Sequence, residues 1–351
     1  MLKTKDFKDD HFEIFENMAD LIRVKDMNNN IIYTNDQILT NNKFNMSTKD
    51  SKRIVDLDDL KNSLQTEETI EGRDYSIKAS PVYNDHGEVI ASIEVFRDVT
   101  RERELETALK RASKEIEKDL LFAKKIQRKI LPRKGKFENI SIDFKYKPSK
   151  YLSGDIFDIF EIDDHTIGVY IVDVAGHGIA ASMLTVFIRQ TMYSVALESK
   201  SPSEVLLKLQ EKFQALELEP ERYFTMFYGV YNLREKELKY ANAGHNSIPF
   251  LFNKDSITML VNHGLPILGF NTDNTYTDKS VRLESRDSIL MYTDGLIEAK
   301  NEYGEEFGED RVKRAILNTQ GNLLEELEDN HANFIGIEQK DDIAMILMSV
   351  K

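Results

Sequence analysis

The sequence predicts an α+β protein with more than one domain, and three observations lead to this fold class. The chain has 351 residues, a length that favours two or three domains, and 41% of them are hydrophobic, enough for packed cores. Residues 11–100 alternate short strand-like runs with turns, and residues 101–132 have the apolar spacing of a helix. Residues 135–351 combine buried strand runs with long helical stretches, so we expect a small domain, a helical linker and a larger domain.

The composition narrows the possible classes of protein. The chain has no cysteine, so disulfides and thiolate metal sites are excluded. A formal net charge of −14 argues against nucleic acid as the main ligand, because phosphate backbones attract basic surfaces. The charged segment 1–10 lacks the apolar stretch of a signal peptide, and no apolar run approaches the roughly 18 residues of a membrane span. We therefore expect a cytoplasmic protein that does not bind membranes.

The first domain is predicted from strand-like runs separated by turn residues. A helix is expected near residues 12–18, and Asn84-Asp85-His86-Gly87 is a strong hairpin signal between the last two strands. Asp98 or Thr100 can cap the helix that follows, and Glu102 falls in its first turn, where the helix dipole favours an acid. The expected strands cover residues 21–25, 31–34, 75–79 and 89–96, with a helical middle between the second and the third.

This order of elements, with its Asp98-Val99-Thr100 exit into a helix, resembles a PAS sensor domain over residues 11–100. An unrelated small α+β domain is the alternative. A flavin photoreceptor of this class needs a reactive cysteine, which the chain lacks. The histidines available to bind haem, His11 and His86, precede the domain core and fall in a turn. The sensor's ligand stays open between a small metabolite, a protein partner and no ligand.

Residues 101–132 are predicted to form a coiled-coil signalling linker. Their apolar residues recur at alternating steps of four and three, with Asp119 at one seam position and Leu120 beside it as an alternative core residue. A surface helix packed on the second domain would show a similar stripe, but a seam of this length without Gly or Pro favours a two-stranded coiled coil. We therefore expect a homodimer in which the helix transmits signals. The seam consists of Leu105, Leu109, Ala112, Ile116, Ala123, Ile126 and Ile130.

Four short acidic segments carry the main chemical signal of the second domain. The first and third place an Asp directly beside a glycine, the second has Gly176 three residues after Asp173, and the fourth is Asp341-Asp342. Aspartate oxygens are hard ligands that suit Mg²⁺ or Mn²⁺, and a neighbouring glycine lets the backbone turn sharply at an ion. One Asp-Gly alone would indicate a hairpin turn, but four acidic segments together favour a metal site. The first three are Ser153-Gly154-Asp155, Asp173 to Gly178 and Tyr292 to Gly295.

With their flanking residues, these segments resemble the PPM-type (protein phosphatase 2C-like) serine/threonine phosphatases, and in particular the stage II sporulation protein E (SpoIIE) branch, which includes regulators of sigma factors. The segments Ala123 to Pro132, Thr225 to Gly229 and Asn242 to Asn246 match the same branch. The resemblance implies an α/β/β/α sandwich over residues 135–351, with two antiparallel sheets face to face and helices outside.

The chain independently shows helix and strand patterns that fit this sandwich. Helices are expected at residues 182–197 and 203–215, and Ser201-Pro202 stands in capping position before the second. Strands are expected at residues 156–162, 168–174, 224–233, 238–241, 289–292 and 343–350.

The resemblance also implies a site for two divalent ions, Mn²⁺ or Mg²⁺. Asp155 and Asp173 would hold the first ion, and Asp173 would bridge to the second. Val174 would offer its backbone carbonyl, and Asp294 and Asp341 would complete the shell of the second ion. Ions roughly 3.5–4 Å apart lower the pKa of a bridging water and bind the transferring phosphoryl group. The four aspartates are therefore the expected catalytic residues.

Four further polar residues have less defined roles in this comparison. Asp158 and Asp342 are expected to act as loop caps or as groups outside the ligand shell. His177 and His245 could each be a general acid, but both stand in Gly-His turns that favour a structural role.

The implied activity is dephosphorylation of phosphoserine or phosphothreonine, on a small anti-anti-sigma (STAS-type) protein whose release frees a sigma factor by partner switching. The chain has no Ser-His-Asp elbow, no cysteine nucleophile and no Gly-x-x-x-x-Gly-Lys phosphate loop, so covalent intermediates and nucleotide binding lack their usual residues. A nucleotidyl cyclase is one alternative, but it gives no role to Asp173, Asp294 or Asp341. A non-enzymatic partner-binding switch is the other, and such proteins usually lack the metal carboxylates.

Overall fold

The computed structural model describes residues 13–16, 18–35, 63–70, 72–176, 178–270, 274–336 and 339–351. The chain divides into two compact units, Met1–Ile116 and Glu117–Lys351, which we describe separately.

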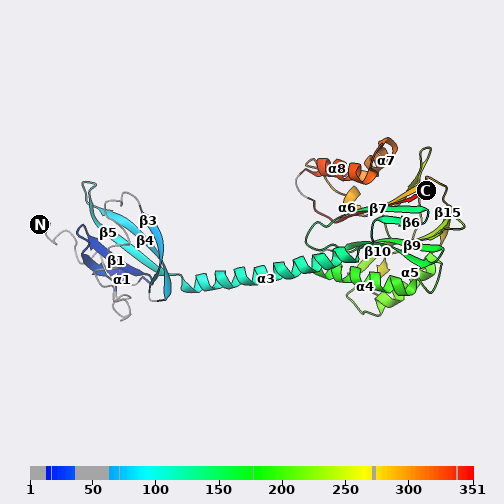
Figure 1. The fold of residues 1–351 in the computed structure, drawn as a ribbon. Coiled ribbons are helices and arrows are strands. Elements are labelled where there is room, and N and C mark those ends of the chain that lie inside the picture. Colours follow the sequence, from blue (N-terminus) through cyan, green and yellow to red (C-terminus); the bar gives the residue numbers. More distant parts are fainter. Residues whose placement is uncertain are drawn as a thin grey trace. The chain divides into compact units, whose positions relative to one another are not determined.

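The N-terminal unit contains a five-stranded antiparallel sheet with the strand order β2-β1-β5-β4-β3 (Figure 1). This order places the first strand, β1, beside the last strand, β5. The sheet is therefore complete only when both ends of the unit are present. The elements are α1 (Glu13–Glu16), β1 (Leu21–Asp26), β2 (Ile31–Thr34), β3 (Leu64–Ile70), β4 (Arg73–Tyr83) and β5 (Val89–Asp98).

The four strands predicted for this unit are confirmed, and so is the hairpin between β4 and β5. Asn84 N donates to Glu88 O across the turn, and Gly87 has a φ of 76°, which glycine adopts without strain. Strand β3 was not predicted, because its sequence LQTEETI is mostly polar and it lies at the sheet edge, where charged side chains prevent pairing with other chains. The predicted helical middle of the domain and His11 lie outside the described residues.

Three charged side chains are buried at the centre of this sheet. Arg23 and Lys25 on β1 face Glu94 on β5, with distances of 2.6 Å from Arg23 Nε to Glu94 Oε2 and 3.0 Å from Lys25 Nζ to Glu94 Oε1. The Arg23 guanidinium also lies over the Phe96 ring. Burial lowers the pKa of Lys25, and the Glu94 carboxylate opposes that shift. The carboxylate therefore makes burial of both cations possible.

Replacing this carboxylate should destabilise the N-terminal unit. We expect Glu94→Ala to reduce its free energy of unfolding by roughly 3–5 kcal/mol, because Arg23 and Lys25 would stay buried without their shared anion. Differential scanning calorimetry of the full chain measures the change, and Asp85→Ala in the exposed hairpin turn is the control with the same change of charge. Equal unfolding temperatures for the two variants would contradict this account.

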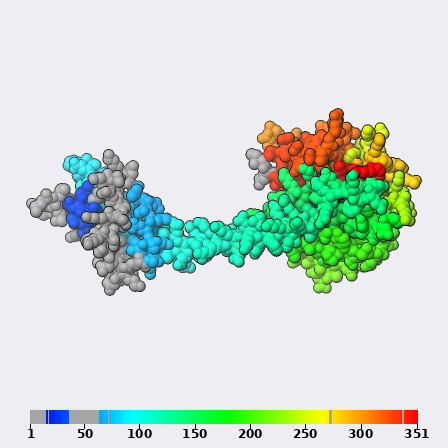
Figure 2. Space-filling model, viewed as in Figure 1, coloured from blue at the N-terminus to red at the C-terminus, as the bar shows by residue number. Residues whose placement is uncertain are grey.

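A single helix, α3 (Thr100–Ile130), follows the sheet. Asp98 Oδ1 accepts a hydrogen bond from Thr100 N at 3.0 Å, and Glu102 lies in the first turn, as predicted. Residues 101–119 are exposed around the helix (Figure 2), including Leu105, Leu109 and Ile116 of the predicted seam. Within the ranges described above, no helix combines the length and the apolar character needed to cross a lipid bilayer.

The last turns of α3 belong to the C-terminal unit and use a different face. Leu120 and Ala123 are partly buried and Gln127 is only 4% exposed, whereas Ile126 of the predicted seam is 47% exposed. Ile130 packs against the core of the C-terminal unit. From Leu120 onward the buried face thus follows steps of three and four that pass through Gln127 and not through Ile126.

The C-terminal unit is built on two six-stranded antiparallel sheets (Figure 1). The first has the order β15-β11-β10-β9-β8, with β14 beside β10, and the second has the order β13-β12-β16-β17-β7-β6. The strands of the first sheet are β8 (Asp155–Asp163), β9 (Thr166–Val174), β10 (Tyr223–Asn232), β11 (Glu237–Ala243), β14 (Ile267–Leu268) and β15 (Lys279–Arg282). Those of the second are β6 (Gly135–Phe137), β7 (Ile140–Lys147), β12 (Phe250–Phe252), β13 (Ile257–Met259), β16 (Ser288–Tyr292) and β17 (Ile343–Val350).

Three hydrophobic cores hold these sheets and their helices in four layers. The helices α4 (Ile179–Val195) and α5 (Pro202–Gln214) cover the outer face of the first sheet. The outer face of the second packs on the short helix α6 (Asp294–Ile297), on α7 (Gly308–Asn318) and on α8 (Leu323–Ile335). Between the sheets, side chains of both inner faces interdigitate, among them Phe157, Ile171, Phe227, Ile289, Met291 and Ile346.

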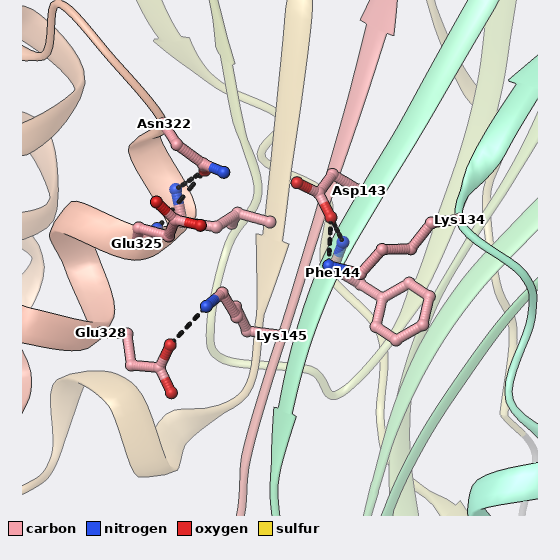
Figure 3. A network of polar contacts seen from close by, with 8 residues as sticks. Lys134, Asp143, Phe144, Lys145, Asn322, Glu325 and Glu328 are labelled. Carbon is pink, nitrogen blue, oxygen red and sulfur yellow. Dashed lines mark hydrogen bonds and ion pairs between the residues drawn. The ribbon is translucent and has the colours of Figure 1, made fainter.

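The predicted elements of this unit are confirmed, with ends that shift by a few residues. Ser201 caps α5 as expected, because its side chain accepts a hydrogen bond from Glu204 N. The strand β7 and the helices α7 and α8 were not predicted. Polar contacts fix α8 over the second sheet (Figure 3): Lys145 Nζ on β7 lies 2.6 Å from Glu328 Oε2, and Asn322 caps the helix.

Candidate metal centre

Two of the predicted carboxylates stand opposite each other at one end of the first sheet. Asp155 is the first residue of β8 and Asp173 the last but one of β9, and the two are direct partners in the antiparallel register. Thr225 on β10 is the partner of Asp173 on the other side. Because cross-strand partners project to the same face, both carboxylates lie on the face that carries Thr225.

The other two predicted carboxylates come from loops at the end of the second sheet. Strand β16 ends at Tyr292, and Asp294 begins α6; Asp341 lies just before the neighbouring strand β17. A Cβ atom on Gly295 would collide with the carbonyl oxygen of Asp342, so only a glycine lets the two loops approach this closely. The Asp-Gly pairing in the sequence thus has a steric reason at this position.

The four carboxylates influence one another electrostatically. Burial, followed by the charges of Asp294, Asp341 and Asp342, raises the pKa of Asp173 to about 7. Burial and the charges of Asp341 and Glu298 raise the pKa of Asp294 to about 6. The pKa of Asp155 is raised well above its usual range, chiefly by burial and by Asp173. The charged neighbours that contribute most to these shifts are other carboxylates, so the cluster concentrates negative charge.

The donor set fits divalent cations. Asp155 Oδ2 is buried and has no hydrogen-bond partner, so a strong acceptor is left available at the centre of the cluster. The Val174 carbonyl oxygen lies against Gly154, beside the same residues. Within the described part of the chain, no three carboxylate or imidazole groups already surround one point at ligand distances. The oxygens that Mg²⁺ or Mn²⁺ prefers are therefore gathered without a preformed coordination shell.

Asp158 and Asp342 have defined roles outside this set. Asp342 accepts three hydrogen bonds, from Ser149 N at 2.6 Å, Ser149 Oγ at 2.9 Å and Gly154 N at 2.8 Å, so both its oxygens are used in holding the first acidic loop. Asp158 forms an ion pair with Arg189 on α4, at 3.0 Å, and accepts from the Tyr193 hydroxyl. It lies within β8 and not in a loop, and it attaches a helix to the sheet.

His245 bridges the two sheets from a buried position. It is 3% exposed, and burial lowers the pKa of its side chain to about 4, so the imidazole is neutral at physiological pH. Its Nε2 donates to the Tyr292 carbonyl at 3.0 Å, which leaves Nδ1 to accept from the Thr225 hydroxyl at 3.1 Å. This arrangement is structural, as its Gly-His turn indicated. His177 lies outside the described residues.

Two residues that support the site were not assigned roles from the sequence. Thr293 Oγ1 accepts from Ala344 N at 2.9 Å, and the same hydroxyl opposes the rise in the pKa of Asp155. Gln127 on α3 is hydrogen-bonded to the main chain of Ser153. The sequence offers one signal for Gln127, a polar residue at a core position of the stripe that passes through Leu120 and Ala123.

Comparison with known proteins agrees with this geometry. The family described as Stage II sporulation protein E (SpoIIE) matches residues 163–351, more than half of the chain. This chain belongs to the SpoIIE family. The match covers β9 through β17 and includes Asp173, Asp294 and Asp341, although Asp155 lies before it.

Two curated relatives match about half of this SpoIIE-family chain. Phosphoserine phosphatase RsbP of Bacillus subtilis (strain 168) is 30% identical over 185 residues, 52% of this chain and 45% of RsbP. Phosphoserine phosphatase RsbU of the same organism is 29% identical over 197 residues, 56% of this chain and 58% of RsbU. The chain thus spans about half the length of the curated relatives it matches.

The fold has counterparts among solved structures. The SiaA-PP2C domain of Pseudomonas aeruginosa superimposes with a TM-score of 0.59 at 23% identity, covering 68% of this chain and 99% of that domain. The SpoIIE-family chain therefore has a PP2C-type fold.

The carboxylate cluster predicts two opposite effects of rising pH. The ion-free protein should become less stable, and Mn²⁺ should stabilise the protein more strongly. The pKa values of Asp173 and Asp294 lie above the unfolded value of 3.8, so the ion-free folded state binds more protons between about pH 4 and pH 7 and loses stability as the pH rises through this window. Mn²⁺ must displace those protons at pH 5 but not at pH 8. We expect Mn²⁺ to raise the unfolding temperature more at pH 8 than at pH 5.

Scanning fluorimetry at the two pH values tests this prediction, with Asp173→Asn and the exposed Asp164→Asn as a matched pair. Asp164→Asn should keep the pH-dependent effect of Mn²⁺ and Asp173→Asn should lose it. The same response in both variants would show that the ion binds elsewhere.

Proposed function

We propose that this chain is a metal-dependent protein serine/threonine phosphatase. The observation that carries the proposal is the cluster of carboxylates gathered from both sheets, with the unpartnered Asp155 Oδ2 inside it. Membership of the SpoIIE family and the names of RsbP and RsbU, both phosphoserine phosphatases, support the activity.

The chain's own residues would hold two ions, Mn²⁺ or Mg²⁺. Asp155 and Asp173 would bind the first, and Asp173 would also contribute to the second. Val174 would offer its backbone carbonyl, and Asp294 and Asp341 would complete the ligands of the second ion. When bound, such a pair of ions lowers the pKa of a water and neutralises charge on the phosphoryl oxygens. Because the pKa of Asp173 is raised to about 7, an ion must displace its proton at acidic pH, and ion binding is favoured as the pH rises above neutral.

The proposed substrate is a phosphoserine or phosphothreonine on a small anti-anti-sigma protein of the STAS type, in the cytoplasm. The resemblance to the SpoIIE branch that regulates sigma factors supports this substrate class, as does the absence of a nucleotide-binding loop in the sequence. Its dephosphorylation would release a sigma factor by partner switching.

The N-terminal unit is proposed to be a PAS-type sensor that regulates the phosphatase. A short helix, two strands and a final antiparallel group of three strands follow one another in the order expected for such a domain. The Asp98 cap, which passes the chain directly into α3, supports the same assignment. We also propose that α3 pairs with a second copy as a coiled coil, since its apolar stripe is exposed in the single chain.

Loss of a carboxylate should abolish hydrolysis. We expect Asp173→Asn or Asp294→Asn to reduce turnover of a phosphoserine protein by more than about 100-fold, because even residues beyond the ligand shell cost up to that factor. Phosphate release with Mn²⁺ measures the effect, and Asp164→Asn is the control. Chelator should remove the activity of the wild type. Full turnover by the metal-free protein would refute the metal-dependent reaction.

Dimerisation through α3 should depend on its apolar stripe. We expect Leu109→Glu combined with Ile116→Glu to convert dimers to monomers, because two like charges would face each other across the seam. Thr107→Glu combined with Lys114→Glu, on the opposite side of the same helix, should leave the dimer intact. Multi-angle light scattering reports the mass, and a wild type that is monomeric at micromolar concentration would exclude the coiled coil.

A further inference from the structure

Both polar atoms of the Gln127 side chain, near the end of α3, form hydrogen bonds with the main chain of Ser153. Its Nε2 donates to Ser153 O at 2.8 Å, and its Oε1 accepts from Ser153 N at 3.1 Å. The side chain is 4% exposed, so these bonds form in a region without competing water. Among uncharged side chains, only an amide offers a donor and an acceptor in one plane with this geometry. The helix is thus attached to Ser153 by a pair of hydrogen bonds to its amide and its carbonyl, like the pair that a neighbouring β-strand forms.

Ser153 passes this contact directly to Asp155. The Ser153 hydroxyl accepts a hydrogen bond from Asp155 N at 3.0 Å, which fixes the backbone of the carboxylate-bearing residue. The residue between them is held from two other elements: Gly154 N donates to Asp342 Oδ2 at 2.8 Å, and Gly154 O accepts from Val174 N at 3.3 Å. The loop of residues 153–155 is therefore held by three elements. Gln127 binds it from α3, Val174 binds it from β9, and Asp342 binds it from the segment before β17.

The same carboxamide also reaches the helix that follows the second acidic segment. Gln127 Nε2 lies 3.4 Å from Thr185 Oγ1 on α4. The Thr185 hydroxyl donates its own hydrogen to Ser182 O at 2.7 Å, so its oxygen is free to accept from Gln127. One side chain thus joins α3 to the loop that carries Asp155 and to α4.

We propose that Gln127 is a positioning residue for the divalent ion held by Asp155. It keeps Ser153 to Asp155 in the conformation that leaves Asp155 Oδ2 buried and available to a cation. The proposal rests on the metal site of the proposed function. Because coupling between two events is reciprocal, attachment of the last turns of α3 strengthens ion binding, and the bound ion strengthens that attachment.

A purely structural Gln127 would behave differently. If its bonds only satisfied the buried main chain of Ser153, its loss would destabilise the ion-free and the ion-bound proteins equally. A positioning role instead changes the affinity for the ion and the ion's effect on α3. Ion affinity, measured without any substrate, therefore separates the two roles.

The test is calorimetric titration of the full-length, metal-free protein with MnCl₂. Gln127→Leu removes both hydrogen bonds at similar volume, and Gln127→Glu keeps the shape and the acceptor but loses the donor. We expect both variants to bind Mn²⁺ about 10- to 100-fold more weakly, the usual effect of residues that orient a ligand. Lys125→Leu, an exposed position on the same turn, should bind like the wild type.

Hydrogen exchange provides the second readout. Mn²⁺ should slow amide exchange in residues 153–155 and 117–130 of the wild type and of Lys125→Leu, but not of Gln127→Leu. If Gln127→Leu fails to fold by circular dichroism, Gln127→Glu and Thr185→Val, which removes the acceptor on α4, take its place in both measurements. Wild-type Mn²⁺ affinity in the Gln127 variants would overturn the positioning role alone. A wild type that binds no Mn²⁺ would overturn the proposed function and this inference with it.

Discussion

Repulsion among the carboxylates of Asp155, Asp173, Asp294 and Asp341 is the constraint on which the rest of the C-terminal unit depends. Folding brings the four groups toward one another and takes Asp155, Asp173 and Asp294 wholly or partly out of water, and both effects raise the pKa values of these three residues. Such an arrangement costs free energy unless a cation joins it, so the surrounding structure must hold the residues in place. The strength of that surrounding structure is what makes a site for cations possible.

The two-sheet architecture meets this constraint by connecting the acidic loops across the sandwich. His245 ties the Thr225 hydroxyl on the first sheet to the Tyr292 carbonyl on the second. Asp342 reaches from the start of β17 to Gly154, and Thr293, beside Asp294, binds the main chain of Ala344. Each connection begins within two residues of a proposed ligand, so the sheets are aligned where their charges meet. Gln127 would extend this support to α3.

Other buried charges in the chain are arranged differently, and the contrast is informative. Asp158 is paired with Arg189, and Glu94 lies between Arg23 and Lys25. In both places the partner of opposite charge comes from a neighbouring element, and the result is attachment of a helix or alignment of two strands. The charged neighbours that act most strongly on Asp173 are the carboxylates of Asp294, Asp341 and Asp342. A group of like charges held close together is the feature that marks the candidate functional site.

The sequence by itself determined the class of fold of the C-terminal unit and the positions of most central strands and helices, and it singled out the four carboxylates on which the proposed function rests. These features are local: alternating or continuous apolar runs define strands, Ser201 marks a helix start, and an Asp beside a Gly marks a turn. Edge strand β3 escaped because its sequence is mostly polar, whereas helices α7 and α8 have apolar stripes as clear as that of α5 and could have been predicted. Only the tertiary structure decided that Asp342 holds Gly154, that His245 joins the sheets, and that α3 buries Gln127 in place of Ile126. Those outcomes depend on hydrogen-bond partners from distant parts of the chain, which no local pattern specifies.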